Sequence, residues 1–152
     1  MKTSPALRAI LTAWLVVGVL DISSAIVIWW QRGTGLRGGL QGIAAAILGP
    51  KATEGGIATA LLGLAIHFFI ALVVVSLFYL ASRKIAILLK QPLVFGALYG
   101  IVVYLVMYWI VLPSVFPTFR HRIGNDALAI AIHISLIGLP TAFIIRRYSA
   151  SE

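Results

Sequence analysis

Four polar side chains interrupt the apolar stretches of this sequence. Asp21 lies within LVVGVLDISSAIVIWW, and the apolar runs 57–80, 93–115 and 127–145 contain His67, Tyr104 and His133. A carboxylate at the centre of a membrane helix costs about 2.5–3.5 kcal/mol on insertion scales, so it needs a proton, a partner or water. Carboxylate, imidazole and phenol groups can also exchange protons and bind ligands. These four residues are therefore the first functional candidates.

The four residues fall at matching positions along their runs. Counted from the run ends expected on one side of the membrane, Asp21 is twelve residues in, His67 thirteen, Tyr104 eleven and His133 twelve. At about 1.5 Å per helical residue, all four lie about 17–20 Å deep. We therefore predict a single polar layer near mid-membrane that faces the bundle interior. Ser24, three residues after Asp21, is a further candidate for ligand or proton binding in this layer.

Four interpretations of this layer are open. The first is a hydrogen-bonded network that only fixes helix pairing. The second is a proton- or ligand-handling site, because ionisable groups within membranes often mark such pathways. The third is b-type haem held between His67 and His133, since haem ligation by two histidines needs no cysteine. The fourth is a zinc or iron site built on Asp21 and the two histidines, although no H-x-x-x-H or E-x-x-H spacing supports it.

No catalytic residue is assigned. The sequence lacks the G-x-S-x-G, P-loop and strand-linked G-x-G-x-x-G motifs of soluble enzymes. It contains no cysteine, which excludes disulfides, thiolate zinc sites and iron–sulfur clusters. No cofactor is predicted beyond the haem alternative.

Composition places these residues in a membrane. Hydrophobic residues make up 61% of the 152-residue chain and charged residues 11%, and the mean hydropathy is +1.06. Soluble domains carry about 25% charged residues. The net charge is +8, but the basic residues flank apolar runs instead of forming a patch among polar residues. This distribution favours contact with lipid and argues against nucleic acid as a partner.

Four runs are long enough to span a bilayer as helices, which requires about 20 residues. They cover residues 9–30, 57–80, 93–115 and 127–145. We predict an all-α integral membrane four-helix bundle forming one transmembrane domain over residues 1–152. Pro113 and Pro117 are expected to end the third span, and Pro140 to kink the fourth.

The connection between the first two spans carries its own helical pattern. Leu36, Leu40, Ile43 and Ile47 recur at spacings of four, three and four. This pattern predicts one face of a short helix over residues 36–48 that ends near Gly49-Pro50. The helix is too short to span, so it is either an amphipathic surface helix or a re-entrant lid over a cavity.

Small residues recur on the faces that carry the polar layer. Gly96 and Gly100 form a G-x-x-x-G ahead of Tyr104, and every fourth residue from Gly55 to Ala71 is small or polar. Such faces suit close helix packing. They also allow homo-oligomers or docking to a larger membrane complex.

Orientation follows from the basic residues. Seven Lys and Arg residues, including Lys2, are expected on the side of both termini, against five on the other. The positive-inside rule therefore predicts cytoplasmic termini. The opposite side carries further candidates in Glu54 and in the basic loop FRHRIGND, where Arg120, His121 and Arg122 are expected to meet lipid headgroups or an anionic ligand.

The chain resembles a group of small four-span bacterial inner-membrane proteins. The similarity lies in VLDISSA, LQGIAAAILGPKATEGG, GGIATALLGLAIHFFIALVVVSLFYLASRK and FGALYGIVVYLVMYWIVLPSV, over about residues 18–115. The resemblance implies a multi-pass protein of the bacterial inner membrane and carries no activity with it. We therefore expect a non-enzymatic accessory or transport-related component with a buried polar layer, and a haem-binding electron-transfer protein as the alternative.

Overall fold

The computed structural model describes residues 4–149, and every regular element within them is helical. Four helices are long and apolar enough to cross a membrane: Pro5–Gln31, Gly56–Lys84, Pro92–Val115 and Ile123–Ser149. The predicted all-α, four-span class is therefore confirmed. Lys2, which was counted for orientation, lies outside the described residues.

The first two spans are single helices, whereas the third and fourth each contain three segments. The first span is α1 (Pro5–Gln31), and the second is α3 (Gly56–Lys84). The third consists of α5 (Pro92–Leu105), a π-helical segment η2 (Val106–Val111) and α6 (Leu112–Val115). The fourth consists of α7 (Ile123–Ile132), a π-helical segment η3 (His133–Gly138) and α8 (Leu139–Ser149).

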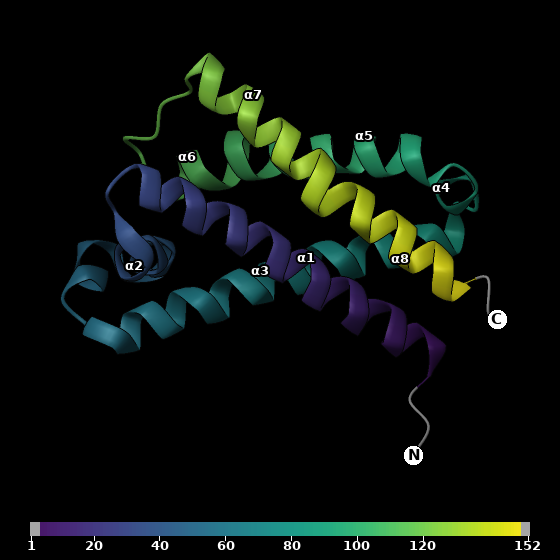
Figure 1. The fold of residues 1–152 in the computed structure, drawn as a ribbon, viewed down its shortest axis with the longest axis horizontal. Helices are drawn as coiled ribbons and strands as arrows, with labels where there is room; N and C mark the ends of the chain where they lie inside the picture. Colours follow the sequence, from purple (N-terminus) through teal and green to yellow (C-terminus); the bar gives the residue numbers. More distant parts are fainter. Residues whose placement is uncertain (1–3, 150–152) are drawn as a thin grey trace.

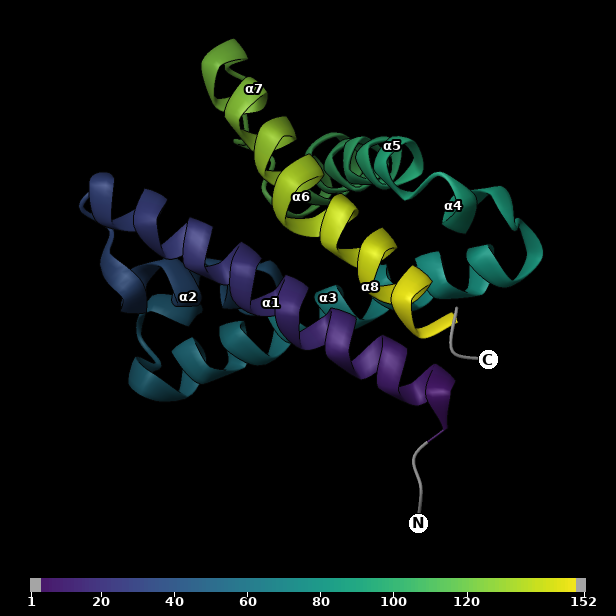
Figure 2. The same ribbon diagram turned by 45° about the vertical axis from the view of Figure 1, so that its right-hand side comes forward.

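The spans form two pairs that meet along α1 and α8. α3 packs against α1, the third span packs against the fourth, and α1 crosses α8 between the pairs. Figures 1 and 2 show the described ends of α1 and α8 at one end of the bundle, together with α4 (Ile87–Lys90). We call this the terminal end. The opposite, far end carries α2 (Gly35–Leu48), the 3-10 turn η1 (Gly49–Thr53) and the loop before α7.

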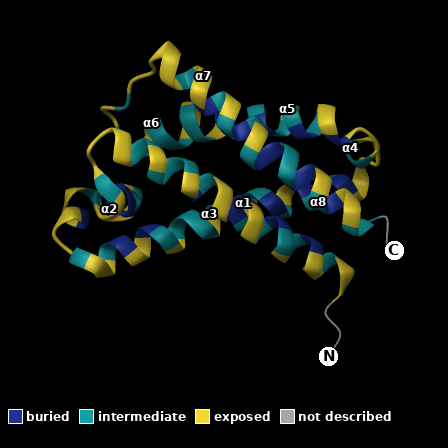
Figure 3. Cartoon of the chain, in the orientation of Figure 1, coloured by how far each residue is buried: buried dark blue, intermediate teal, exposed yellow. Residues whose placement is uncertain are grey.

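The half of the bundle nearer the terminal end is densely filled, and we call it the packed half. Its buried cluster draws on all four spans and consists of Ala13, Val17, Val75, Phe78, Val103, Ile137, Ala142 and Ile145. Figure 3 shows buried positions of α1, α5 and α8 turned toward one another in this region. Helices in lipid are held together mainly by van der Waals packing. This cluster is therefore the main source of cohesion between the two pairs.

The third and fourth spans cross at small residues, as the G-x-x-x-G motif predicts. A Cβ atom at Gly100 would lie 2.5 Å from the His133 carbonyl oxygen, and one at Gly138 would lie 2.6 Å from the Gly100 nitrogen. Only glycine fits such close backbone approach. The crossing fixes the position of His133, which begins η3.

The third span ends between its two prolines. It continues past Pro113 through α6 to Val115, and the chain becomes extended at Phe116, directly before Pro117. In addition, each π-helical segment stops two residues before a proline, η2 before Pro113 and η3 before Pro140. Proline lacks an N–H, and its ring clashes with the carbonyl four residues earlier. Widening the preceding turn into a π-helix relieves that clash within a continuous span.

α2 packs on α1 and α3, and the predicted face is packed only in part, through Leu40 and Ile43. Leu36 and Ile47 are 50% and 69% exposed, whereas Gly39, Leu40 and Ala44 are buried. The backbone of α2 at Leu40 and Ala44 lies against Gly63 of α3, and Gly39 lies against the Trp29 ring of α1, so both contacts need a glycine. The helix ends as predicted, with Gly49 at φ 61° and Pro50 at the start of η1.

A buried glutamine secures this packing. The Gln41 amide nitrogen donates to the Gly56 carbonyl oxygen at 3.0 Å and to the Thr59 hydroxyl at 3.2 Å. Thr59 in turn donates to the Ala52 carbonyl oxygen at 2.6 Å. These bonds join α2, η1 and the start of α3, so α2 is anchored across the far end.

Candidate functional site

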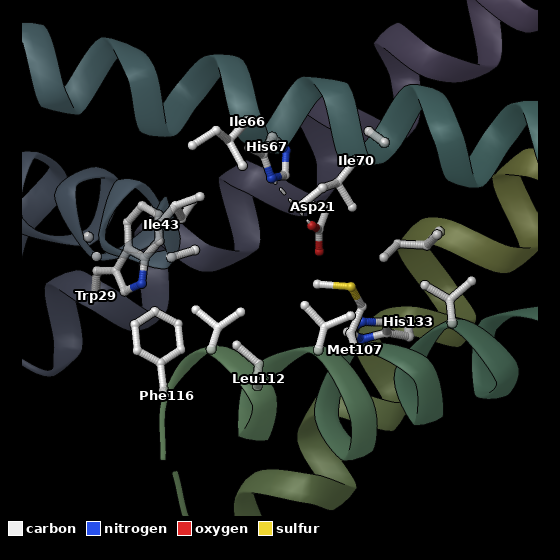
Figure 4. A pocket seen from close by; sticks show the side chains of 18 of the residues that line it. Asp21, Trp29, Ile43, Ile66, His67, Ile70, Met107, Leu112, Phe116 and His133 are labelled. Atoms are coloured by element: carbon white, nitrogen blue, oxygen red, sulfur yellow. Dashed lines mark ion pairs between the residues drawn. The ribbon is translucent and has the colours of Figure 1, made fainter. Parts of the chain in front are cut away.

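A cavity of about 430 Å³ lies between α3 and the third span, in the half of the bundle nearer the far end. We call it cavity 1 (Figure 4). α3 contributes Ile66, His67 and Ile70, the third span contributes Met107 and Leu112, Phe116 follows that span, and α2 contributes Gly38, Gly42 and Ile43. α2 therefore closes part of the cavity, in agreement with the lid interpretation. At the inner end, the Tyr99 hydroxyl of α5 bridges to α3 by donating to the Val74 carbonyl oxygen at 2.6 Å.

Asp21 of α1 and His67 of α3 form an ion pair on the wall of this cavity. The Asp21 Oδ2 atom lies 3.9 Å from the His67 Nδ1 atom, as the dashed line in Figure 4 marks. The other ring nitrogen, Nε2, donates to the Gly18 carbonyl oxygen at 2.9 Å. A carbonyl oxygen can only accept, so Nε2 carries a proton. The Nδ1 atom therefore faces the Asp21 carboxylate, at a separation too long for a direct hydrogen bond.

His133 lies at the same level on the fourth span and also lines cavity 1. Its Nδ1 atom donates to the Ala129 carbonyl oxygen at 2.8 Å, which leaves Nε2 as the acceptor of the neutral ring. Tyr104, only 3% exposed, meets the His133 ring edge-on at 5.9 Å and stacks on Tyr108 at 4.8 Å. Tyr104 thus supports His133 from behind and does not itself line the cavity.

The predicted layer is thus brought together in two contacting groups, Asp21 with His67 and His133 with Tyr104. Ser24 belongs beside Asp21, but its hydroxyl donates to the Asp21 backbone oxygen at 2.8 Å and not to the carboxylate. Ser23 donates to the Val19 carbonyl oxygen at 2.6 Å and is exposed on the bundle surface. Ser24 instead lines a second cavity.

This second cavity, which we call cavity 2, has a volume of about 300 Å³ and lies between α1, η2 and α7. Its wall is much more polar than that of cavity 1 and includes Ser24, Arg32, Tyr108, Arg120, Asn125 and Asp126. Asp21 and His133 line both cavities. The two cavities therefore adjoin at these two side chains.

The far-end candidates occupy separate places. Arg120 lines cavity 2, and its guanidinium donates to the carbonyl oxygens of Pro117 at 3.0 Å and Phe119 at 2.8 Å. His121 stacks on Trp109 at 4.2 Å and pairs with Asp126 at 3.3 Å. Arg122 is exposed ahead of α7, and Glu54 is exposed between η1 and α3. Neither Glu54 nor Arg122 lines either cavity.

Several site residues carry no signal in the sequence. Met107, Leu112 and Phe116 are ordinary apolar residues in or directly after a span, and only the path of the third span turns them toward cavity 1. Trp29, near the end of the first span, lines both cavities. Arg32 also lines both, and its guanidinium donates to the Asn125 side chain at 3.3 Å. Arg32 directly follows α1 and is eleven residues, about three helical turns, from Asp21, which is the sequence spacing that points to this face.

The ring nitrogens bear on the haem and metal alternatives. His67 has one ring nitrogen committed to Gly18 and the other directed at Asp21, so the carboxylate occupies space that a porphyrin bound to His67 would need. The residues therefore do not fit haem ligation by two histidines. Among residues 4–149, no three His, Cys, Asp or Glu side chains gather as a metal site. We derive no chemistry through either group.

No protein-family model, curated protein or solved structure matches this chain.

Proposed function

We propose that this protein is a transport-related component of the bacterial inner membrane that binds a lipophilic molecule in cavity 1. The observation that carries the proposal is the Asp21–His67 pair on the wall of an apolar cavity of about 430 Å³. Small-molecule sites are commonly about 300–1,000 Å³, mostly apolar, with a few polar groups that fix orientation. Cavity 1 has this composition.

The polar groups favour a ligand whose head group donates a hydrogen bond. The His67 Nε2 proton is already used by Gly18, so the pair presents the Asp21 carboxylate as its available acceptor. A primary amine or a hydroxyl would pair with this carboxylate, and the cationic amine would do so more strongly. The apolar body of the ligand would lie against Ile70, Met107 and Phe116.

The membrane supplies the route to this site. The facing surfaces of α3 and the third span are separated by cavity 1 and are bridged at its inner end by Tyr99. A lipophilic molecule dissolved in the bilayer would enter between these two spans. With cytoplasmic termini, as the positive-inside rule predicts, the cavity would open in the outer half of the bilayer.

Fluorescence quenching tests the proposal directly, because Trp29 lines cavity 1. A variant that keeps Trp29 and carries phenylalanine at the other three tryptophans would be reconstituted in nanodiscs. Alkyl chains with a terminal bromine, a tryptophan quencher, would be added as the amine, the alcohol and the methyl ester. We expect saturable quenching by the amine and the alcohol, and only linear partition-type quenching by the ester.

Substitution of the carboxylate separates a binding site from a purely structural network. Asp21→Asn should weaken amine binding at least tenfold while the unfolding transition is retained. Ser23→Ala, at the same depth on the bundle surface, is the matched control and should bind the amine normally. Linear quenching by all three probes, or equal quenching in both variants, contradicts the proposal. Loss of folding in Asp21→Asn with unaltered binding in the remaining folded fraction favours the structural network.

A further inference from the structure

Cavity 2 differs from cavity 1 in the chemistry of its wall. Its polar side chains come from several elements: Ser24 from α1, Arg32 directly after α1, Tyr108 from η2, Arg120 from the loop, and Asp126 from α7. Arg32, Arg120 and Asn125 are exposed at the far end. A wall with this many donors and acceptors holds water, since a buried water requires two to four polar partners.

The deep end of cavity 2 reaches the polar layer. Asp21 and His133 belong to its wall as well as to that of cavity 1. The His133 Nδ1 atom is held by the Ala129 carbonyl oxygen, so a proton arriving at this ring is accepted by Nε2. The Asp21 carboxylate is the second acceptor at this level. Water in cavity 2 would therefore meet two proton acceptors about halfway through the membrane.

The packed half closes the route on the other side. Val17 and Ile137, 1% and 6% exposed, lie at the boundary between cavity 1 and the buried cluster. Beyond them the buried hydroxyls are used internally, with Thr141 donating to the Ile137 carbonyl oxygen at 2.7 Å and Ser82 to that of Tyr79 at 2.7 Å. Among the described residues, no buried side-chain nitrogen or oxygen lacks a partner. These buried hydroxyls are therefore not available to bind water.

We propose that cavity 2 is a water-filled vestibule through which Asp21 and His133 exchange protons with the aqueous phase at the far end only. A hydronium ion in the vestibule gives its proton to the His133 Nε2 atom or to the Asp21 carboxylate and leaves as water, and the reverse step restores it. The charged and titratable groups that face this exchange are Arg32, His67, Tyr108, Arg120 and Asp126. The vestibule exists whether or not a lipophilic ligand occupies cavity 1.

Cysteine labelling tests the vestibule, because the natural chain contains no cysteine. Three single-cysteine variants, Ser24→Cys, Ser23→Cys and Thr141→Cys, would be treated with a membrane-impermeant cationic thiosulfonate. The reagent would be added to vesicles from one side at a time. Ser24→Cys should react from the far end at least ten times faster than from the terminal end, and at least ten times faster than Ser23→Cys from either side. Thr141→Cys, buried in the packed half, should remain unmodified.

A cavity-filling substitution and an infrared measurement of Asp21 protonation complete the test. Ala25→Leu, which fills cavity 2, should slow the labelling of Ser24→Cys without moving the unfolding transition. In oriented vesicles, the infrared carboxyl band of Asp21, identified by its loss in Asp21→Asn, should respond to a pH jump at the far end and not at the terminal end. Equal labelling of Ser24→Cys and Ser23→Cys, or a response to pH at the terminal end, overturns the proposal.

Discussion

The two halves of the bundle are built from the same four helices and yet are packed in opposite ways. In the packed half, Val75, Phe78 and Ile145 are at most 1% exposed. In the half nearer the far end, which we call the hollow half, two adjoining cavities of about 430 and 300 Å³ separate the spans. The change occurs where Tyr99 joins α5 to α3. Beyond that bridge the third span stays with the fourth, and α3 stays with α1 and α2.

The packed half therefore holds the spans together, and the hollow half carries the ionisable residues that can bind ligands or protons. The ionisable residues of the polar layer, Asp21, His67 and His133, all line cavities of the hollow half. The π-helical segments η2 and η3 also border these cavities, through Met107 and His133. Such segments are frequent at functional sites. A bundle held together at one end can keep open space at the other.

The largest predicted effect comes from removing volume in the packed half. Phe78→Ala empties a fully buried site that packs against the Tyr99 ring at 4.9 Å. Transfer of the ring from lipid to the protein interior contributes little, because lipid is itself apolar. The empty space left by the ring still costs packing energy, so we expect the free energy of unfolding to fall by about 3 kcal/mol. Phe116→Ala, on the wall of cavity 1, should cost less than about 1 kcal/mol, because its surroundings are already open. Unfolding by denaturing detergent measures both, and equal losses would refute the division into two halves.

Enlarging a side chain should destabilise the packed half and leave the stability of the hollow half almost unchanged. Ala13 is 0% exposed in the packed half, whereas Ala46 of α2 lines cavity 1. Ala13→Leu should destabilise the protein by about 1–3 kcal/mol through overpacking. Ala46→Leu should change stability by less than about 0.5 kcal/mol, since the added methyl groups enter open space. It should also weaken quenching of Trp29 by the brominated amine, whereas unchanged quenching would mean that the probe binds elsewhere.

Much of this architecture follows from the sequence, because membrane spans have a strong and simple signature. Apolar length predicts the four helices, and the equal depth of Asp21, His67 and His133 predicts that they share a layer. Gly96 and Gly100 predict the close crossing that positions His133. These features depend on one helix at a time or on one motif.

The cavities could not be predicted, because they depend on which helices separate. No residue type marks the divergence of α3 from the third span, and apolar residues such as Met107 and Phe116 look alike whether they face lipid or a cavity. The packed face of α2 was predicted only in part for a similar reason. Leu40 is buried as expected, but the contacts with α1 and α3 also bury Gly39 and Ala44 and leave Ile47 exposed. In a bilayer, exposure of an apolar residue carries little cost.

The anchoring of α2 provides a smaller and more local test of the hollow half. Gln41→Leu removes the donor to the Gly56 carbonyl oxygen and the Thr59 hydroxyl. Loss of a partner for a buried carbonyl costs about 1–3 kcal/mol. We therefore expect amide hydrogen exchange in α2 to accelerate at least tenfold while exchange in α8 is unchanged. Gln91→Leu, exposed at the terminal end, is the control, and acceleration throughout the bundle would show that α2 is not a separate unit.

The smallest predicted effect concerns single hydrogen bonds at the two ends of the bundle. In the packed half, the hydroxyls of Thr12 and Tyr148 join α1 to α8 at 3.1 Å in a partly buried position. A double-mutant cycle with Thr12→Val and Tyr148→Phe should give a coupling of about 0.6 kcal/mol, the usual size for such bonds in membrane proteins. At the far end, the bond from Arg32 to Asn125 is exposed, and water competes for both groups. The cycle with Arg32→Gln and Asn125→Ala should therefore give less than about 0.3 kcal/mol. A larger coupling at the far end than between Thr12 and Tyr148 would mean that this bond, and not only α2, holds the hollow half together.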